Sequence, residues 1–470
     1  MTAMQPADLL TASRLDVLGK LPFAESISAK CDSAWAREFY FECLLALNPN
    51  RLFSENGEKF QLSDYEHFFR KLMASLESDG FNSKVSEVLV TNSSTLWNGA
   101  HRLAGCLALN EEIHVRSVEE TNQNYGWAFF ENSGMHRVYL DELAWQFTQK
   151  VKSTRAIVLS GLPKEQEGLI RKRLEADNAL IFAKTLDLSE VGSRRNIELM
   201  YGHLAWFSKE LLEKLLLERF GTDIDKRVTV LLYDQPRNLD ERKLKEELRS
   251  LLPGNAFERK IHGSDDWSET LRLAEVWTNS NSLRFLNSAP IGCEDVILGK
   301  LRDEIGSQKA SNANFVIDGG ASLELYGVTE TSDVDHVCLT KHPEHLVAIG
   351  DCHNSEYLEI GVSSSELILD PRKHMRWAGF KFSSLESEFL RLRLLGTEKS
   401  YQQLITLLSS LEAQSGKLFF DSDRSARAAK WQRKSLWQIR LDNFLAKLPP
   451  GARRFLAKVA SSVRLWQMNR

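Results

Sequence analysis

Six cysteines are spread over 470 residues, and no two of them form a CxxC pair. This scattering argues against a zinc site and against a disulfide framework, and it fits a reducing cytoplasm. No apolar run approaches the length of a membrane-spanning helix, and the opening MTAMQPADLLTASRLDVLGK lacks the apolar segment of a signal peptide. Internal repeats and low-complexity tracts are also missing. We therefore expect a cytoplasmic globular protein.

The composition fits that expectation, with 43% hydrophobic and 26% charged residues. A chain of 470 residues is too long for one ordinary core, so we expect about three domains. The net charge of −4 is uneven, because residues 424–470 hold twelve Lys or Arg and one acid. That segment carries +11 and leaves −15 on the remainder. Since only the C-terminal segment is basic, it needs an explanation of its own.

Hydrophobic periodicity divides the chain into three regions and a tail. Residues 1–150 combine helical patterns with short strand-like runs, which predicts an α+β module. Residues 151–290 alternate apolar strands with charged helices, which predicts βα units and a mainly parallel sheet. Residues 291–422 contain further short strands and helices, and residues 423–470 form a basic amphipathic helical tail. The predicted fold class is multi-domain α/β, with α+β parts.

The third region carries a glycine turn followed by paired aspartates. The strand-like run 315–318 leads into Gly319 and Gly320, and Asp333 and Asp335 follow at i and i+2. On a strand, that spacing points both carboxylates to one face, where they repel. Magnesium would compensate, because it binds through one or two carboxylates plus substrate phosphates. Glycines at the turn would let the backbone approach those phosphates.

Gly-Gly on a strand–helix turn, about a dozen residues and then Asp-x-Asp resembles the signature of the DNA polymerase β-type nucleotidyltransferase superfamily, over roughly 291–400. The resemblance implies Mg²⁺ on the aspartate pair and a nucleoside triphosphate, ATP or CTP, at the glycine turn and Ser322. It also implies a third carboxylate, on a later strand, that activates the acceptor hydroxyl. Asp370 in SELILDP is the first candidate for that role and Glu359 the second. Thr329 stands where related sequences often carry an arginine.

A second constellation is the segment NGAHR, residues 98–102, between a predicted strand and a predicted helix. A turn there presents helix N–H groups to an anion, and an arginine can bind the anion bidentately. The layout resembles the ParB/sulfiredoxin fold, whose members carry a Gly-x-His-Arg or Gly-x-x-Arg box. The resemblance implies phosphate binding by Asn98, Gly99 and Arg102 and a catalytic role for His101. Known activities of that fold include nucleotide hydrolysis on DNA and phosphorylation of free serine.

The segment KIHGSDDWSET, residues 260–270, places His262 between a strand and a helix. Asp266 and Glu269 have the spacing of an N-cap with a capping box, and we interpret them in that way. The alternative is a His–Asp pair with a phosphate at the helix N-terminus.

The tail ends in ARRFLAKVASSVRLWQMNR, which a helical wheel sorts into an apolar stripe and a basic face. The stripe consists of Phe455, Leu456, Val459, Val463 and Trp466. A basic helix with a Trp-bearing stripe is typical of an interfacial membrane helix, so residues 450–470 would contact the inner face of a membrane. The alternative is that the tail docks on the acidic remainder. Nucleic acid ranks behind both.

These features predict an enzyme that handles nucleotides at two sites, a phosphoryl or nucleotidyl transferase acting on a small metabolite or a surface-polysaccharide precursor. Two alternatives stay open. The first is a ParB-like DNA-associated protein that uses a nucleotide as a switch. The second is a non-catalytic scaffold built from decayed transferase domains.

Overall fold

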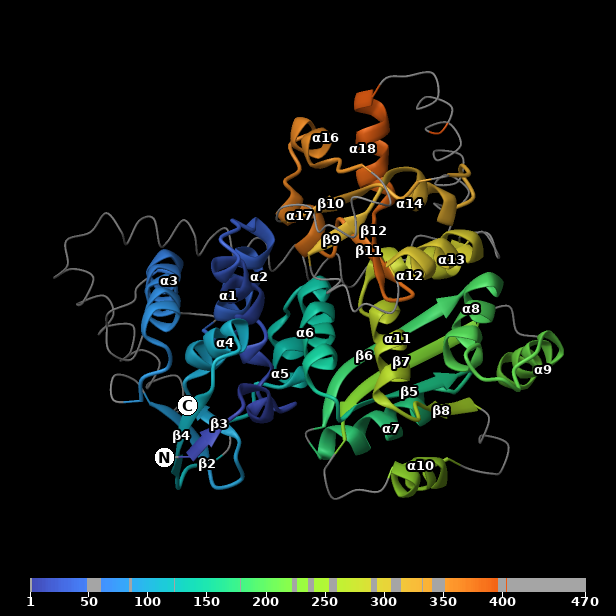
Figure 1. Cartoon of the computed structure of the whole chain (residues 1–470). Helices are drawn as coiled ribbons and strands as arrows, with labels where there is room; N and C mark the ends of the chain where they lie inside the picture. The colour runs from blue at the N-terminus through green and yellow to red at the C-terminus, as the bar shows by residue number, and fades with distance from the viewer. Residues whose placement is uncertain are drawn as a thin grey trace.

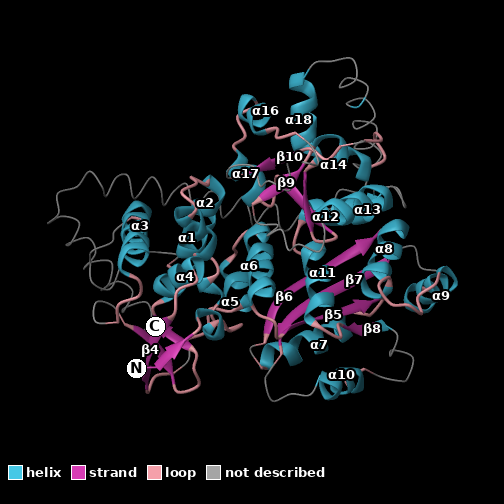
Figure 2. Cartoon of the chain, in the orientation of Figure 1, coloured by secondary structure: helices cyan, strands magenta, loops and turns pink. Residues whose placement is uncertain are grey.

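The computed structural model describes residues 2–48, 61–83, 87–121, 123–177, 179–221, 226–235, 241–252, 260–288, 294–305, 314–331, 333–339, 351–395 and 403. Each of the three predicted regions contains one four-stranded sheet, and helices flank the sheets (Figures 1 and 2). This arrangement confirms the general α/β class. The predicted tail, residues 423–470, lies outside the described residues. Within them, every helix is too short or too polar to cross a bilayer.

The N-terminal region has a mixed sheet of order β1-β4-β2-β3. Strands β2 and β4 pair in parallel, and the other two pairings are antiparallel. Its strands are β1 (Thr2–Met4), β2 (Val88–Thr91), β3 (Leu96–Asn98) and β4 (Ile113–Val118). Its helices are η1 (Pro6–Leu9), η2 (Leu15–Val17), α1 (Leu21–Ser28), α2 (Ala34–Leu47), α3 (Leu62–Asp79), α4 (Ala100–Leu109), α5 (Trp127–Ser133) and α6 (Arg137–Lys150).

The central region has a sheet of order β6-β7-β5-β8, and all its pairings are antiparallel. Its strands are β5 (Thr154–Ser160), β6 (Leu180–Leu188), β7 (Lys226–Asp234) and β8 (Ile261–Gly263). Its helices are α7 (Lys164–Ala176), α8 (Glu190–Tyr201), α9 (Lys209–Phe220), α10 (Glu241–Ser250), α11 (Trp267–Trp277) and α12 (Ser280–Ser288).

The predicted mainly parallel sheet for residues 151–290 is therefore wrong. Each connection with a single helix between its strands does join two strands that run in the same direction, β5 to β6 and β7 to β8. The connection from β6 to β7 contains two helices, α8 and α9, and returns the chain in the opposite direction. The two pairs then interleave, so that every neighbour in the sheet is antiparallel. A single helix between two strands therefore predicts that both run in the same direction, but it does not predict which strands become neighbours in the sheet.

The third region has a sheet of order β10-β9-β12-β11, in which only β9 and β12 pair in parallel. Its strands are β9 (Phe315–Ile317), β10 (His336–Cys338), β11 (His374–Trp377) and β12 (Phe380–Ser383). Its helices are α13 (Glu294–Ile305), α14 (Gly319–Leu325), α16 (Asn354–Glu359), α17 (Ser364–Leu369) and α18 (Leu385–Leu395). Val316 and Val337 face a small core with α16 and α17, whereas Phe315, Ile317 and Cys338 join the main core.

One main hydrophobic cluster continues through all three regions. Helix α6 packs on β6 and α11, and α11 and α12 pack on β11 (Figure 1). A buried ion pair joins Arg376 Nη2 in β11 to Glu142 Oε2 in α6 at 2.6 Å. The Asn281 side chain in α12 donates to the His374 carbonyl at 2.9 Å. The third region is therefore held against both of the others by buried polar contacts as well as by apolar packing.

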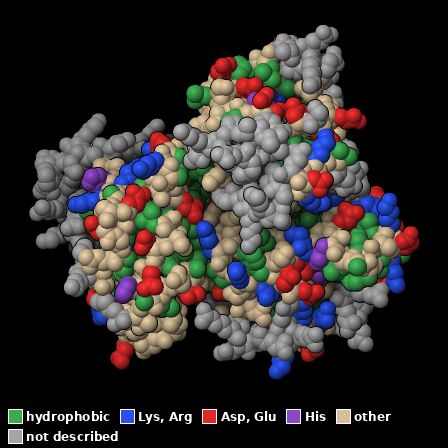
Figure 3. Space-filling model, in the orientation of Figure 1, with side chains coloured by type: hydrophobic (Ala, Val, Ile, Leu, Met, Phe, Trp, Pro, Cys, Tyr) green, Lys and Arg blue, Asp and Glu red, His purple; other side chains and the backbone are tan. Residues whose placement is uncertain are grey.

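On the face of the molecule drawn in Figure 3, Lys and Arg side chains are interspersed with Asp and Glu over the described residues. Charges of both signs accompany the helices of all three regions in that view. The strongly basic segment, residues 424–470, lies outside the described residues.

Candidate functional site

The turn from β9 into α14 forms as the glycine pair indicates. Gly319 follows Asp318 directly and adopts φ of 64°, a left-handed conformation that favours glycine. A Cβ atom on Gly319 would lie 3.0 Å from Asp335 Oδ2 and 3.3 Å from Arg391 Nη2. The turn and the second aspartate are thus in contact, as the sequence predicts, although about fifteen residues separate them in the chain.

Asp333 and Asp335 precede β10 and do not lie on it, contrary to the expectation that they share a strand face. Asp333 is exposed, and its Oδ1 accepts a hydrogen bond from Thr331 Oγ1 at 2.8 Å. That threonine packs against Gly320, where an added Cβ would lie only 2.5 Å from Thr331 Oγ1. Asp335 is partly buried against Gly319. The two carboxylates therefore lie at different depths beside the glycine turn.

Ser322 and Asp370 do not join this site. The buried Ser322 hydroxyl donates to the Ile317 carbonyl at 3.0 Å and accepts from Ser383 Oγ at 3.0 Å, so it links β9 to β12. Asp370 follows helix α17 and accepts from Arg372 Nε at 2.9 Å. The predicted strand SELILD is wrong, because Ser363 and Glu366 form a capping box that begins a helix there. Glu359, the second candidate, is exposed at the end of α16.

In their place, the structure gathers four carboxylates and two cationic side chains around the glycine turn. This group, here called the acidic cluster, consists of Asp318, Asp335, Glu356, Glu388, His353 and Arg391. Asp318 and Glu388 have no exposed surface, and Glu356 is 30% exposed. Asp335 and His353 are 17% and 15% exposed, so with Glu356 they form the accessible part of the cluster. Of its members, the sequence singled out only Asp335.

His353 links two of the aspartates. Its Nδ1 lies 3.0 Å from Asp318 Oδ2, and its Nε2 lies 3.8 Å from Asp335 Oδ2 and 3.9 Å from Glu356 Oε1. The other oxygen of Asp335 accepts a hydrogen bond from the Asp351 N–H at 3.2 Å. The imidazole therefore bridges the buried and the accessible parts of the acidic cluster.

Glu388 holds the inner end of the cluster together. Its Oε1 accepts from the Gly319 N–H at 3.0 Å and from the Tyr357 hydroxyl at 3.0 Å. Its Oε2 accepts from Arg391 Nε at 3.1 Å, and Arg391 Nη1 reaches Glu356 Oε2 at 3.1 Å. This pair comes from LESEFLRLR, a segment in which the sequence shows only a helical pattern.

The electrostatics of the cluster reflect burial and close charges. Burial raises the pKa of Asp318 to about 6, with Glu388 adding to the effect and His353 opposing it. Burial likewise raises the pKa of Asp335. Burial alone would lower the pKa of His353, but the hydrogen bond to Asp318 and the charges of the surrounding carboxylates raise it to about 9. Asp318 Oδ1 is buried and has no hydrogen-bond partner among the described residues.

The ParB-like segment forms the predicted turn between β3 and α4. Gly99 has φ of 109°, and an added Cβ would lie 2.9 Å from a methyl group of Val88 in β2. Asn98 is exposed at the end of β3. His101 Nε2 lies 3.0 Å from the Tyr40 hydroxyl. Arg102 Nη1 donates to the Glu87 carbonyl, so in this structure its guanidinium binds the neighbouring backbone.

A cavity of about 400 Å³ lies in the central region, between α8, α9, α10 and β8. His262 lines it, and the imidazole Nε2 lies 2.5 Å from Glu269 Oε1. Burial lowers the pKa of His262 although Glu269 opposes the shift. Asp266 accepts the Glu269 N–H at 2.7 Å as the N-cap of α11, as predicted. The partner of His262 is therefore Glu269, not an aspartate.

No family model matches the chain, and no curated protein or solved structure matches it either. The resemblances to the nucleotidyltransferase superfamily and to the ParB/sulfiredoxin fold therefore rest on sequence motifs. The evidence on function is the geometry of the acidic cluster and of the NGAHR turn.

Proposed function

We propose that this chain is a magnesium-dependent nucleotidyl or phosphoryl transferase whose site is the acidic cluster with its glycine turn. The observation that carries the proposal is the close approach of Asp335 to Gly319, where a Cβ would lie 3.0 Å from the carboxylate. Because Gly319 has no side chain, Asp335 and Arg391 can both approach the backbone of the turn, which would bring a metal ion and a phosphate bound by them close together.

The donors of the cluster are carboxylate oxygens, the ligand type that a hard divalent cation prefers. Among the described residues, the side chains close enough to share one ion are His336, Cys338 and Cys352, so Asp318, Asp333 and Asp335 would have to draw together when the ion binds. With Asp333 added to the cluster, five carboxylates and two cations leave a charge of −3 when all groups are ionised, which one Mg²⁺ would reduce to −1. Asp318 Oδ1 is buried without a partner among the described residues, and an unmatched carboxylate oxygen is costly away from water. Asp333 and Asp335 would hold the ion, and Asp318 replaces Asp370 as the third carboxylate. Bound there, the ion would neutralise the charge that develops on the transferred phosphoryl group.

The remaining residues of the cluster suit a phosphate-bearing substrate. Arg391 Nη2 reaches the glycine turn, 3.3 Å from the position of a Cβ on Gly319, and is held by Glu388 and Glu356. His353 Nε2 faces Asp335, so a protonated imidazole adds a second positive charge beside the turn. Fixed positive groups where negative charge develops are the usual source of catalysis in phosphoryl transfer. The acceptor hydroxyl would come from a small metabolite or a surface-polysaccharide precursor.

The scaffold alternative has specific support in two contacts. The Ser322 hydroxyl is bonded inside the domain, and Arg102 Nη1 is bonded to a backbone carbonyl. Neither group is free to bind a phosphate without rearrangement. The ParB-like alternative depends on the same Arg102. Both alternatives predict that Mg²⁺ does not alter nucleotide binding at Asp335.

The test is calorimetric titration of the full chain with ATP and with CTP, each with and without Mg²⁺. We expect one of the two nucleotides to bind only with Mg²⁺, and Asp335→Asn to weaken that binding more than tenfold, because a charged metal ligand is lost. Asp187→Asn is the matched control, since Asp187 is exposed on β6 in the central sheet. If neither nucleotide binds the wild-type chain with Mg²⁺, or if Asp335→Asn binds as the control does, the proposal fails.

A further inference from the structure

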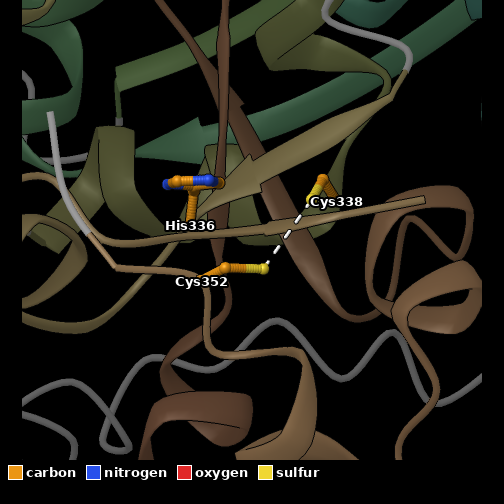
Figure 4. Close-up of side chains that lie close together, drawn as sticks. All are labelled: His336, Cys338 and Cys352. Atoms are coloured by element: carbon orange, nitrogen blue, oxygen red, sulfur yellow. Dashed lines mark hydrogen bonds between the residues drawn. The ribbon is translucent and has the colours of Figure 1, made fainter. Parts of the chain in front are cut away.

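One imidazole and two thiol side chains meet beside strand β10. His336 and Cys338 lie at i and i+2 of this strand and therefore point to the same side. Cys352 pairs with His336 in a parallel bridge and lies beside them. Figure 4 shows the three side chains gathered, with the two sulfur atoms facing one another. Their ligand atoms all lie within 4.8 Å of one another.

The spacing of the sulfur atoms matches shared coordination of one metal ion. Cys338 Sγ and Cys352 Sγ are 3.7 Å apart. Two thiolates bound to zinc at about 2.3 Å with a tetrahedral angle would be separated by about 3.8 Å. A disulfide would need about 2.0 Å between the same atoms. The two thiols, which are within hydrogen-bond distance of each other, thus also stand at the distance that a tetrahedral ion requires.

The backbone that carries these ligands is tied in place on both sides. The His336 N–H donates to the Asp351 carbonyl at 3.0 Å, and the His353 N–H donates to the His336 carbonyl at 3.0 Å. Asn354 accepts from the Cys338 N–H at 3.1 Å and donates to the Cys338 carbonyl at 3.0 Å. A metal ion at this position would need little reorganisation of the protein, and ligands fixed in advance in this way raise metal affinity.

We propose that His336, Cys338 and Cys352 form a zinc site with a fourth coordination position left for water or another ligand. One imidazole and two thiolates suit zinc, whereas magnesium and calcium take oxygen ligands. His336 and Cys338 are buried, and Cys352 is partly exposed, so the ion would lie at the edge of the main core. This site is separate from the acidic cluster and goes beyond the proposed transferase function.

The ion would hold the segment that begins at Asp351 against β10. That segment supplies the Asp351 N–H and the His353 imidazole to Asp335. Zinc would therefore link this segment to β10 and keep His353 in place.

The direct test measures zinc in the full chain, purified under reducing conditions with zinc supplied and then dialysed against a weak chelator. We expect one zinc per chain by mass spectrometry of the metal, and loss of at least four-fifths of it in Cys352→Ser, roughly as expected when a thiolate ligand is removed. Cys31→Ser is the matched control, because Cys31 is also a free, partly exposed thiol but lies far from the three proposed zinc ligands in the chain. The control should keep its zinc.

A second measurement does not depend on whether the variant folds. Cobalt bound to the wild-type chain in place of zinc should show thiolate-to-metal charge-transfer absorption together with the visible bands of a tetrahedral ion. The proposal is overturned if the wild-type chain retains no zinc, if Cys352→Ser folds and keeps its zinc, or if bound cobalt shows no thiolate charge transfer. It is also overturned if mass analysis of the purified chain finds Cys338 and Cys352 joined in a disulfide.

Discussion

Glu388 offers the sharpest test of the acidic cluster, through the variant Glu388→Gln. The wild-type carboxylate has no exposed surface and accepts from the Gly319 N–H, the Tyr357 hydroxyl and Arg391 Nε. Glutamine keeps the shape but removes the charge and replaces one acceptor oxygen with an NH₂ donor. That donor would face groups that are themselves donors. The substitution therefore breaks a buried ion pair and leaves at least one hydrogen bond unmade.

The expected loss of unfolding free energy follows from the contacts that remain in Glu388→Gln. Removing one partner of a buried ion pair costs about 3–5 kcal/mol in unfolding free energy. Arg391 keeps its second contact, to Glu356 at 3.1 Å, so we expect about 3 kcal/mol, the lower end of that range. For a cooperative unit of about 150–250 residues, this corresponds to a decrease in Tm of about 6–12 °C.

Glu386→Gln on the same helix is the matched control. Glu386 is 57% exposed and pairs with Arg284, and such pairs at the surface contribute about 0–1 kcal/mol. Thermal unfolding followed by circular dichroism, with urea titration as a second probe, measures both variants. A Glu388→Gln protein as stable as wild type would refute the reasoning, because it would mean that Glu388 is already uncharged in the fold. Equal destabilisation by both variants would contradict the role of burial.

Three further predictions use other parts of the chain. Burial would raise the pKa of Asp16, but the charges of Lys20 and Arg14 lower it to about 2. The Asp16 carboxylate therefore contributes stability that is fully present above the pKa of the unfolded chain, about 3.9, and is lost as the pH falls towards 2. The difference in urea midpoint between wild type and Asp16→Asn should therefore shrink between about pH 4 and 2. If Arg102 turns from its backbone partner to bind a phosphate, Arg102→Ala should weaken nucleotide binding at the N-terminal region about ten- to hundredfold, as measured by calorimetry. Unchanged binding would show that the NGAHR turn is not a nucleotide site. Deleting 450–470 should abolish salt-sensitive flotation with anionic liposomes and leave the Tm unchanged, whereas a lower Tm would favour docking on the acidic body.

The parts of the third region that the sequence predicted are those set by local chemistry. An apolar run followed by two glycines predicted β9 and its turn, because glycine adopts the φ of 64° at Gly319 without strain and leaves room for the approach of Asp335. The N-cap at Asp266 was predicted for the same reason, since its partner is only three residues away. SELILD was misassigned as a strand because short apolar runs are ambiguous, and the capping box of Ser363 decided the outcome.

The rest of the cluster could not be predicted from spacing. Glu388 reaches Gly319 across 69 residues, so only the packing of α18 against α14 brings them together. Cys352 likewise lies 14 residues beyond Cys338 and meets it through a bridge outside the named strands. The sequence argument against a zinc site considered only cysteines in CxxC pairs, whereas the proposed site combines ligands that are up to 16 residues apart. Long-range pairing of strands is the step that a single sequence does not specify.

The chain at the start of β10 connects the two proposed sites, and because consecutive residues there belong to different sites, the sites can be tested separately. Asp335 approaches the glycine turn, whereas His336, the next residue, turns towards Cys352 on the other side. Asp335→Asn should therefore weaken magnesium-dependent nucleotide binding more than tenfold and leave the zinc content at one per chain. Cys352→Ser should lose zinc and also weaken nucleotide binding, because His353 is then held less firmly beside Asp335. A loss of zinc in Asp335→Asn would show that the acidic cluster and the zinc site are not independent. Intact nucleotide binding in a folded, zinc-free Cys352→Ser protein would show that zinc does not position His353.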